Sequence, residues 1–132
     1  HLTRDVLWQP HLLDHPNGVL SLEECWFASP DARATAEKLA RLTGGRLEKG
    51  AGIYRLPLAQ GALVVMDHAR WRALGPESLP PPESPVGMVF RVASLAHTAS
   101  LFEQNGVQFG RSVHAVAISA SDACGTALSF RQ

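Results

Sequence analysis

"VLSLEECWFASPDARATAEKLARLTGG", residues 19–45, decides the fold of this chain, because it joins a strand pattern directly to a helix whose two ends are marked. Residues 19–29 are rich in β-forming and apolar side chains and predict a strand. Ser29 is a preferred N-cap, Pro30 suits the first helical position, and Gly44 is a typical helix stop. The stretch therefore predicts a strand that runs straight into a helix.

The same order returns in the second half of the chain. "VGMVFRVASLAHTASLFEQNG", residues 86–106, predicts a strand followed by a helix that Ser94 caps and Gly106 ends. Further strands are expected after each helix, in residues 52–67, 107–119 and 125–132. Two similar units about sixty residues apart indicate an internal duplication. We therefore expect an α+β fold of two βαβββ units, because neither unit could bury its sheet face alone.

The domain organisation follows from this repeat and from one proline-rich segment. "SLPPPESP" cannot continue a helix or a sheet and predicts a stiff linker. The expected parts are an extended lead-in over residues 1–17, a first unit over 18–77, a linker over 78–85 and a second unit over 86–132. Together the two units are expected to form one domain.

Composition limits the class of partner. The chain has 132 residues, 45% of them hydrophobic, and its 12 basic and 12 acidic residues give a formal net charge of zero. A neutral surface favours a small-molecule ligand over nucleic acid, and no apolar run is long enough to cross a membrane. Cys25 and Cys124 form no CxxC pair, so we expect buried free thiols in a reducing cytoplasm.

A resemblance to a known family rests on several stretches taken together. They are "ASPDARATAEKLARLTG", "GALVVMD", "VGMVFRVASL" and "DACGTALSFRQ", with "HPNGVLSL" ahead of the first unit. They resemble the glyoxalase, bleomycin-resistance and extradiol-dioxygenase group, also called the vicinal oxygen chelate superfamily, and in particular its glyoxalase-like domain proteins. The resemblance implies paired, curved mixed sheets around a cleft, with the helices on the outside.

The resemblance also implies where a metal would be held, at one position on the first and last strand of each unit. In this chain those positions fall on Glu24, Val64, Gly87 and Ser129. Valine and glycine side chains offer no donor atom, and about three protein ligands are usual for a catalytic metal. We therefore expect no metal and no cofactor, with Ser129 as a neutral hydrogen-bonding group.

Candidate ligand-binding residues follow from strand alternation, which places every second side chain on one face of a sheet. If Glu24 faces the cleft, Trp26 does so too, and Cys25 turns toward the helix. Arg91 shares the cleft face of the second unit and supplies a positive charge. The other candidates are Tyr54, His114 and Ser129. This set favours a small planar molecule with a carboxylate or enolate edge.

Three hypotheses about function remain open at this point. The first is a binding module that captures a small organic molecule in a metal-free cleft, as the resemblance to the bleomycin-resistance members implies. The second is a metal-dependent lyase, isomerase or dioxygenase of the same superfamily. The third is a structural or dimerisation half of a longer glyoxalase-like protein, which the absence of an initial methionine favours. We also expect a homodimer, because the linker is long enough for units to pair within a chain or between chains.

Overall fold

The computed structural model describes residues 9, 11, 15–50, 52–74 and 84–132. The strands are β1 (Val19–Ser29), β2 (Glu48–Gly50), β3 (Ile53–Pro57), β4 (Ala62–Asp67), β5 (Ser84–Val92), β6 (Gly110–Arg111), β7 (Val116–Ile118) and β8 (Ala127–Arg131). The helices are α3 (Ala32–Thr43), α4 (His68–Ala73) and α5 (Leu95–Gln104). Most of the expected lead-in and residues 78–83 of the expected linker lie outside the described residues, and β5 begins within the expected linker, at Ser84.

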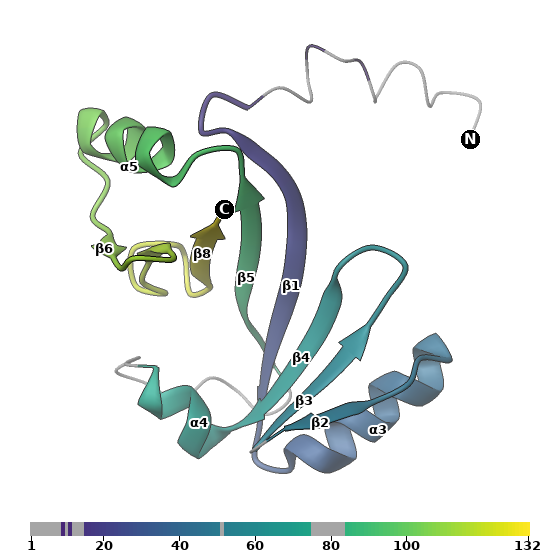
Figure 1. Cartoon of the computed structure of the whole chain (residues 1–132). Coiled ribbons are helices and arrows are strands. Elements are labelled where there is room, and N and C mark those ends of the chain that lie inside the picture. The colour runs from purple at the N-terminus through teal and green to yellow at the C-terminus, as the bar shows by residue number, and fades with distance from the viewer. Residues whose placement is uncertain (1–8, 10, 12–14, 51, 75–83) are drawn as a thin grey trace.

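The predicted α+β fold of two βαβββ units is confirmed (Figure 1). Each unit places its first strand parallel to its last, so β1 pairs with β4 and β5 pairs with β8. The units join because β1 and β5 pair in antiparallel orientation. The result is one eight-stranded mixed sheet with the order β2-β3-β4-β1-β5-β8-β7-β6. The two sheets expected from the sequence are therefore two halves of one continuous sheet within a single chain.

The N-cap of α3 lies two residues after the one predicted from the sequence. Asp31, not Ser29, is the N-cap, and its carboxylate accepts a hydrogen bond from the backbone N–H of Ala34. The buried hydroxyl of Ser29 instead bonds the hydroxyl of Thr35 at 2.8 Å, and it also accepts from the N–H of Asp31. At the other end, Gly44 ends the helix in the left-handed conformation as predicted. Ser29 thus fixes the turn between β1 and α3 from inside the core.

The cap predicted for the second helix is confirmed. The hydroxyl of Ser94 accepts from the backbone N–H of His97, as an N-cap does. Gly106 follows the helix with a φ of +67°. The N–H groups of Gly106 and Val107 reach back to the carbonyls of Glu103 and Phe102, which is the pattern of a Schellman motif.

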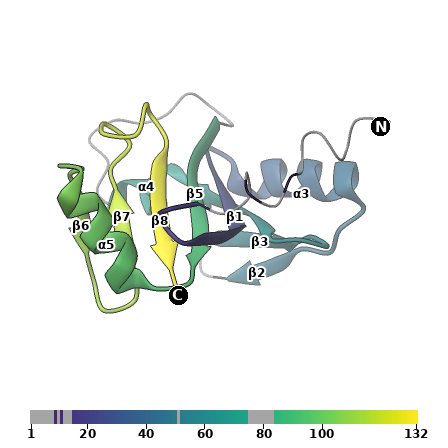
Figure 2. The same ribbon diagram turned by 90° about the horizontal axis from the view of Figure 1, so that it is seen from above.

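The core has a separate cluster for each helix. α3 packs over Phe27, Tyr54 and Val65, and α5 packs over Phe90 and Phe130. In Figure 2 these two helices lie at opposite ends of the molecule, each against its own half of the sheet. A third cluster, formed by Ala28, Val64, Met66, Trp71 and Val86, brings Trp71 of α4 onto the other face of the sheet, where Trp26 also packs. The sequence did not predict α4, which partly covers the face on which the cleft lies.

Gly61 fixes the β3–β4 turn against β1, and it gives the first testable prediction. Its φ is +73°, and a Cβ there would lie 2.8 Å from the carbonyl oxygen of Glu23. We expect Gly61→Ala to lower the free energy of unfolding by about 2–3 kcal/mol, because a clash adds to the left-handed backbone cost. Gly44→Ala is the matched control, with φ +69° and open space around it, and should cost about 1 kcal/mol. Urea denaturation measures both variants, and an equal loss of unfolding free energy in the two would show that the close contact with β1 adds no cost.

Candidate functional site

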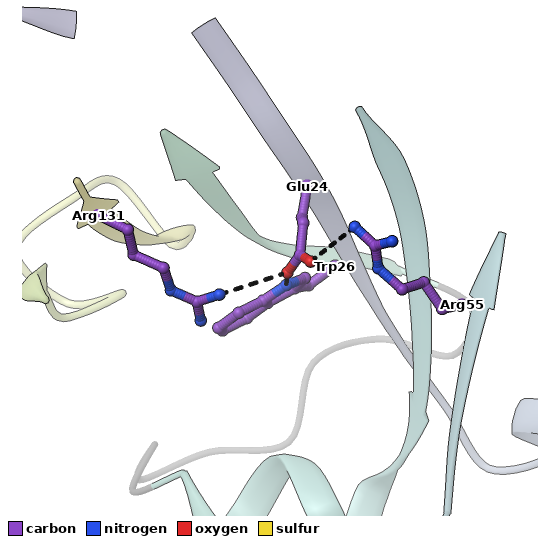
Figure 3. A network of polar contacts seen from close by, with 4 residues as sticks. All are labelled: Glu24, Trp26, Arg55 and Arg131. Atoms are coloured by element: carbon purple, nitrogen blue, oxygen red, sulfur yellow. Dashed lines mark hydrogen bonds and ion pairs between the residues drawn. The ribbon is translucent and has the colours of Figure 1, made fainter. Parts of the chain in front are cut away.

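A polar network lies at the centre of the cleft face, on β1 (Figure 3). The carboxylate of Glu24 is its hub, and its side chain is 17% exposed. The indole Nε1–H of Trp26 donates to Glu24 Oε2 at 2.9 Å, and Arg55 Nη2 of β3 donates to Oε1 at 3.2 Å. Arg131 Nη1 of β8 lies 3.9 Å from Oε2. Side chains from three strands therefore meet at one carboxylate.

Arg131 also contacts Trp26. Its guanidinium carbon lies 5.9 Å from the centre of the indole ring, within the range of a cation–π interaction. Strand alternation along β8 places Arg131 on the same face as Ser129, and parallel pairing brings Ser129 beside Val89 of β5. Arg55 and Arg131 are each 44% exposed, so each ion pair contributes at most about 1 kcal/mol. The guanidinium groups are consequently held in place but remain accessible.

The four positions that would hold a metal do not fit one. Glu24 is already bound by two guanidinium groups and an indole N–H. Val64 is buried and apolar, and Ser129 is a buried hydroxyl. A Cβ on Gly87 would lie 3.0 Å from Cε3 of Trp26, so the indole ring fills the space beside that position. No group of three His, Cys, Asp or Glu side chains that could hold a metal occurs among the residues that the structure describes.

Two hollows on the cleft face lie beside Trp26. One, of about 390 Å³, is largely apolar. Its lining includes Trp71, Ala117, Ile118, Ala127, Leu128 and Ser129. The other, of about 300 Å³, is lined by the charged groups Glu24, Arg55, Arg70 and Arg131 beside apolar residues of β3 and β4. Trp26 and Leu74 line both. We call the first the apolar hollow and the second the charged hollow.

Three of the six predicted ligand-binding residues lie at these hollows. Glu24, Trp26 and Ser129 line one or both of them. Strand alternation from Glu24 had indicated Trp26, and the family resemblance had implied Ser129. Two others do not. Tyr54 packs against α3 on the opposite face of the sheet, because β3 carries Arg55 on the cleft face. His114 lies at the exposed bend between β6 and β7 instead of within a strand, so its side chain has no place in the cleft.

Arg91 is the sixth predicted residue, and it lines neither of these two hollows. Its Nε lies 3.4 Å from Glu23 Oε1, and the side chain is 55% exposed. A register shift in β1 between Leu22 and Glu24 explains this pairing, because an irregularity there changes which side chains face Arg91. Arg91 and Glu23 line a separate open hollow near the β3–β4 turn.

The sequence prediction missed the residues that carry positive charge into the cleft. Arg131 could have been found by alternation from Ser129, since it lies two residues further along the same strand. Arg55 depends on the pairing of β3 with β4 and of β4 with β1, which no local pattern reveals. Trp71 lies on the unpredicted helix α4, and its indole nitrogen is buried without a hydrogen-bond partner.

The two cysteines differ in their surroundings. Cys25 is partly buried on the helix side of β1, and burial raises the pKa of its thiol, which disfavours the reactive thiolate. Cys124 is exposed and has a φ of +55°, so the expectation that both thiols are buried was wrong for this residue. It lies in the turn before β8.

This fold is that of the vicinal oxygen chelate group, as the resemblance predicted. One similar solved structure is a methylmalonyl-CoA epimerase with 15% identity and a TM-score of 0.62, covering 86% of this chain and 95% of that one. The epimerase of Mycobacterium tuberculosis has 16% identity and a TM-score of 0.61, covering 86% and 88%. A Streptomyces coelicolor epimerase variant in complex with 2-nitronate-propionyl-CoA has 14% identity and a TM-score of 0.58, covering 85% and 96%. At these identities the likeness establishes the fold.

Other comparisons add no family. No protein-family model matches the chain. No curated protein matches it significantly. Among the residues that the structure describes, no helix has the length and apolar composition needed to cross a bilayer.

The mismatch of the four metal positions gives a second prediction. Protein purified without added metal and then incubated with manganese, iron, nickel or zinc should retain substoichiometric ion after desalting, because Val64 and Gly87 offer no donor atom. Elemental analysis measures this directly. Glu24→Gln is the matched control and should retain no less ion than the unaltered protein. A stoichiometric ion that is lost in Glu24→Gln would contradict the prediction and restore a metalloenzyme.

Proposed function

We propose that this protein is a metal-free binding module whose cleft takes a small organic anion with a flat apolar part. One observation carries the proposal. The guanidinium of Arg131 lies over the ring of Trp26, and Trp26 lines both the charged and the apolar hollow. A cation beside an aromatic wall is suited to a molecule that is flat and apolar along its length and anionic at one end.

The size and lining of the hollows support a ligand of this kind. Their volumes of about 390 and 300 Å³ fall at the lower end of the range usual for small-molecule sites, roughly 300–1,000 Å³. The apolar hollow would bury the body of the ligand, and apolar burial supplies most of the affinity. The charged hollow has three arginines against one glutamate, so its local charge favours an anion.

The similar structures give this proposal a precedent on the same fold. One is a methylmalonyl-CoA epimerase in complex with methylmalonyl-CoA and ammonium, and another holds 2-nitronate-propionyl-CoA. Organic ligands therefore occur on proteins of this fold. The donor set at Glu24, Val64, Gly87 and Ser129 favours binding over metal-dependent isomerisation in this chain, because two of those positions have no metal ligand.

The third prediction tests binding and the role of Arg131. Isothermal titration with trans-cinnamate, a planar carboxylate, should show binding that Arg131→Gln weakens about tenfold, since a charge-assisted hydrogen bond is lost. Trans-cinnamamide has the same shape without the charge, and Arg131→Gln should leave its affinity unchanged. Arg91→Gln is the matched control, because Arg91 lies outside both hollows.

The outcomes distinguish a ligand-binding cleft from one whose residues have a structural role only. A family of aromatic and keto acids, including phenylpyruvate, extends the test beyond one compound. If none of these anions binds, the cleft is not a site for such molecules. If Arg131→Gln lowers the melting temperature and leaves cinnamate binding intact, the guanidinium is part of the scaffold.

We also propose that the protein is a cytoplasmic homodimer. Among the described strands, the short strands β2 and β6 end the sheet, and open sheet edges can pair with a second copy. Since β1 and β5 join the two units within one chain, the dimer is not needed to form the cleft. Light scattering over a wide concentration range should give the mass of two chains. A monomer at every concentration would contradict this proposal.

A further inference from the structure

We propose that Glu24 acts as an internal substitute for the anionic group of the ligand, and that a bound carboxylate takes its place on Arg131. This inference rests on the function proposed above and specifies how the cleft selects its ligand. In the free protein the Glu24 carboxylate occupies the position of the missing anion, between the guanidinium groups of Arg55 and Arg131 (Figure 3). On binding, Arg131 exchanges one carboxylate for another.

The distances around Glu24 show which contact is released. Trp26 Nε1 donates to Oε2 at 2.9 Å and Arg55 Nη2 donates to Oε1 at 3.2 Å, and both are hydrogen bonds. The contact with Arg131 Nη1 is 3.9 Å, too long for a hydrogen bond. When Arg131 turns to a ligand, Glu24 therefore keeps both of its hydrogen-bonded partners. Its charge is not left uncompensated in a position that is only 17% exposed.

Arg131 is placed to receive a ligand carboxylate. Its backbone is held by the pairing of β8 with β5, while its side chain is 44% exposed and borders the charged hollow. A guanidinium carries five N–H donors in a planar fork that matches a carboxylate. The indole of Trp26 lies beneath it and extends to the apolar hollow. A carboxylate on Arg131 thus brings the body of the ligand over the aromatic ring.

This exchange predicts selectivity for carboxylates over neutral analogues. A carboxylate replaces the attraction that Arg131 loses when it leaves Glu24, whereas a neutral amide does not. The class of ligand is therefore a small monocarboxylate with a flat apolar body. Glu24 is a competitor in this scheme and not a group that binds the ligand.

The test is the effect of Glu24 variants on cinnamate affinity, measured by isothermal titration. Glu24→Gln keeps an oxygen that can accept from Trp26 and removes the competing charge, so it should tighten cinnamate binding about fivefold. Glu24→Asp keeps the charge but withdraws it by one methylene from Arg131, so it should also tighten binding. Glu23→Gln is the matched control, because Glu23 pairs with Arg91 outside both hollows, and it should leave the affinity unchanged.

A double variant tests whether the gain passes through Arg131. If Glu24 competes for this guanidinium, Glu24→Gln should give no gain in an Arg131→Gln background. Melting temperatures of all variants check that each one folds. Should Glu24→Gln fail to fold, the Asp variant decides the question.

The outcomes distinguish this inference from the proposed function. If the unaltered protein binds cinnamate and the folded Glu24 variants bind it no more tightly, the inference is wrong and the proposed function stands. A gain in Glu23→Gln as large as in Glu24→Gln overturns it as well, because the effect would then be a general change of surface charge. If neither the unaltered protein nor any variant binds cinnamate, both the inference and the proposed function are wrong.

Discussion

The antiparallel pairing of β1 with β5 is the interaction on which the rest of the structure depends. Each unit alone is half of a sheet with one long helix on its outer face, and the other face is covered only in part, by α4 of the first unit. The pairing places Glu24 beside Val89 and Trp26 beside Gly87, so residues of both units share one surface. Because each first strand is also parallel to the last strand of its own unit, β4 and β8 flank this central pair. The cleft residues therefore come from strands that are distant in sequence and adjacent in the sheet.

Close packing at the centre of this surface decides what chemistry it can support. The ring of Trp26 lies against Gly87, where a Cβ would approach it to 3.0 Å. This contact orients the indole so that its Nε1–H reaches Glu24 and its face meets Arg131. Thus an aromatic side chain and an ion-pair network fill the space that metal ligands would need. At the positions where the resemblance implied metal ligands, this chain has an indole ring beside a carboxylate with guanidinium partners.

The carboxylate of Glu24 is paired with cations that are not deeply buried. A carboxylate with little exposure needs partners, and Glu24 has two hydrogen bonds and one longer ionic contact. Deeply buried ion pairs are hard to exchange because both charges have lost their hydration. Arg55 and Arg131 retain nearly half of their exposure, so a ligand can approach them at low cost. This combination of a held carboxylate and accessible guanidinium groups is the basis of the anion exchange that we propose.

The sequence by itself determined the duplication, the two helices with Ser94, Gly44 and Gly106 at their ends, and the shared face of Glu24 and Trp26. These features depend on local backbone preferences and on strand alternation, which act over a few residues. Only the tertiary structure decided that Arg55 and Arg131 meet Glu24, that Arg91 pairs with Glu23, and that Tyr54 and His114 lie away from the cleft. Those outcomes depend on which strands pair, on a register shift in β1 and on where a strand gives way to a bend. Register and pairing are set by contacts between distant segments, so no local pattern contains them.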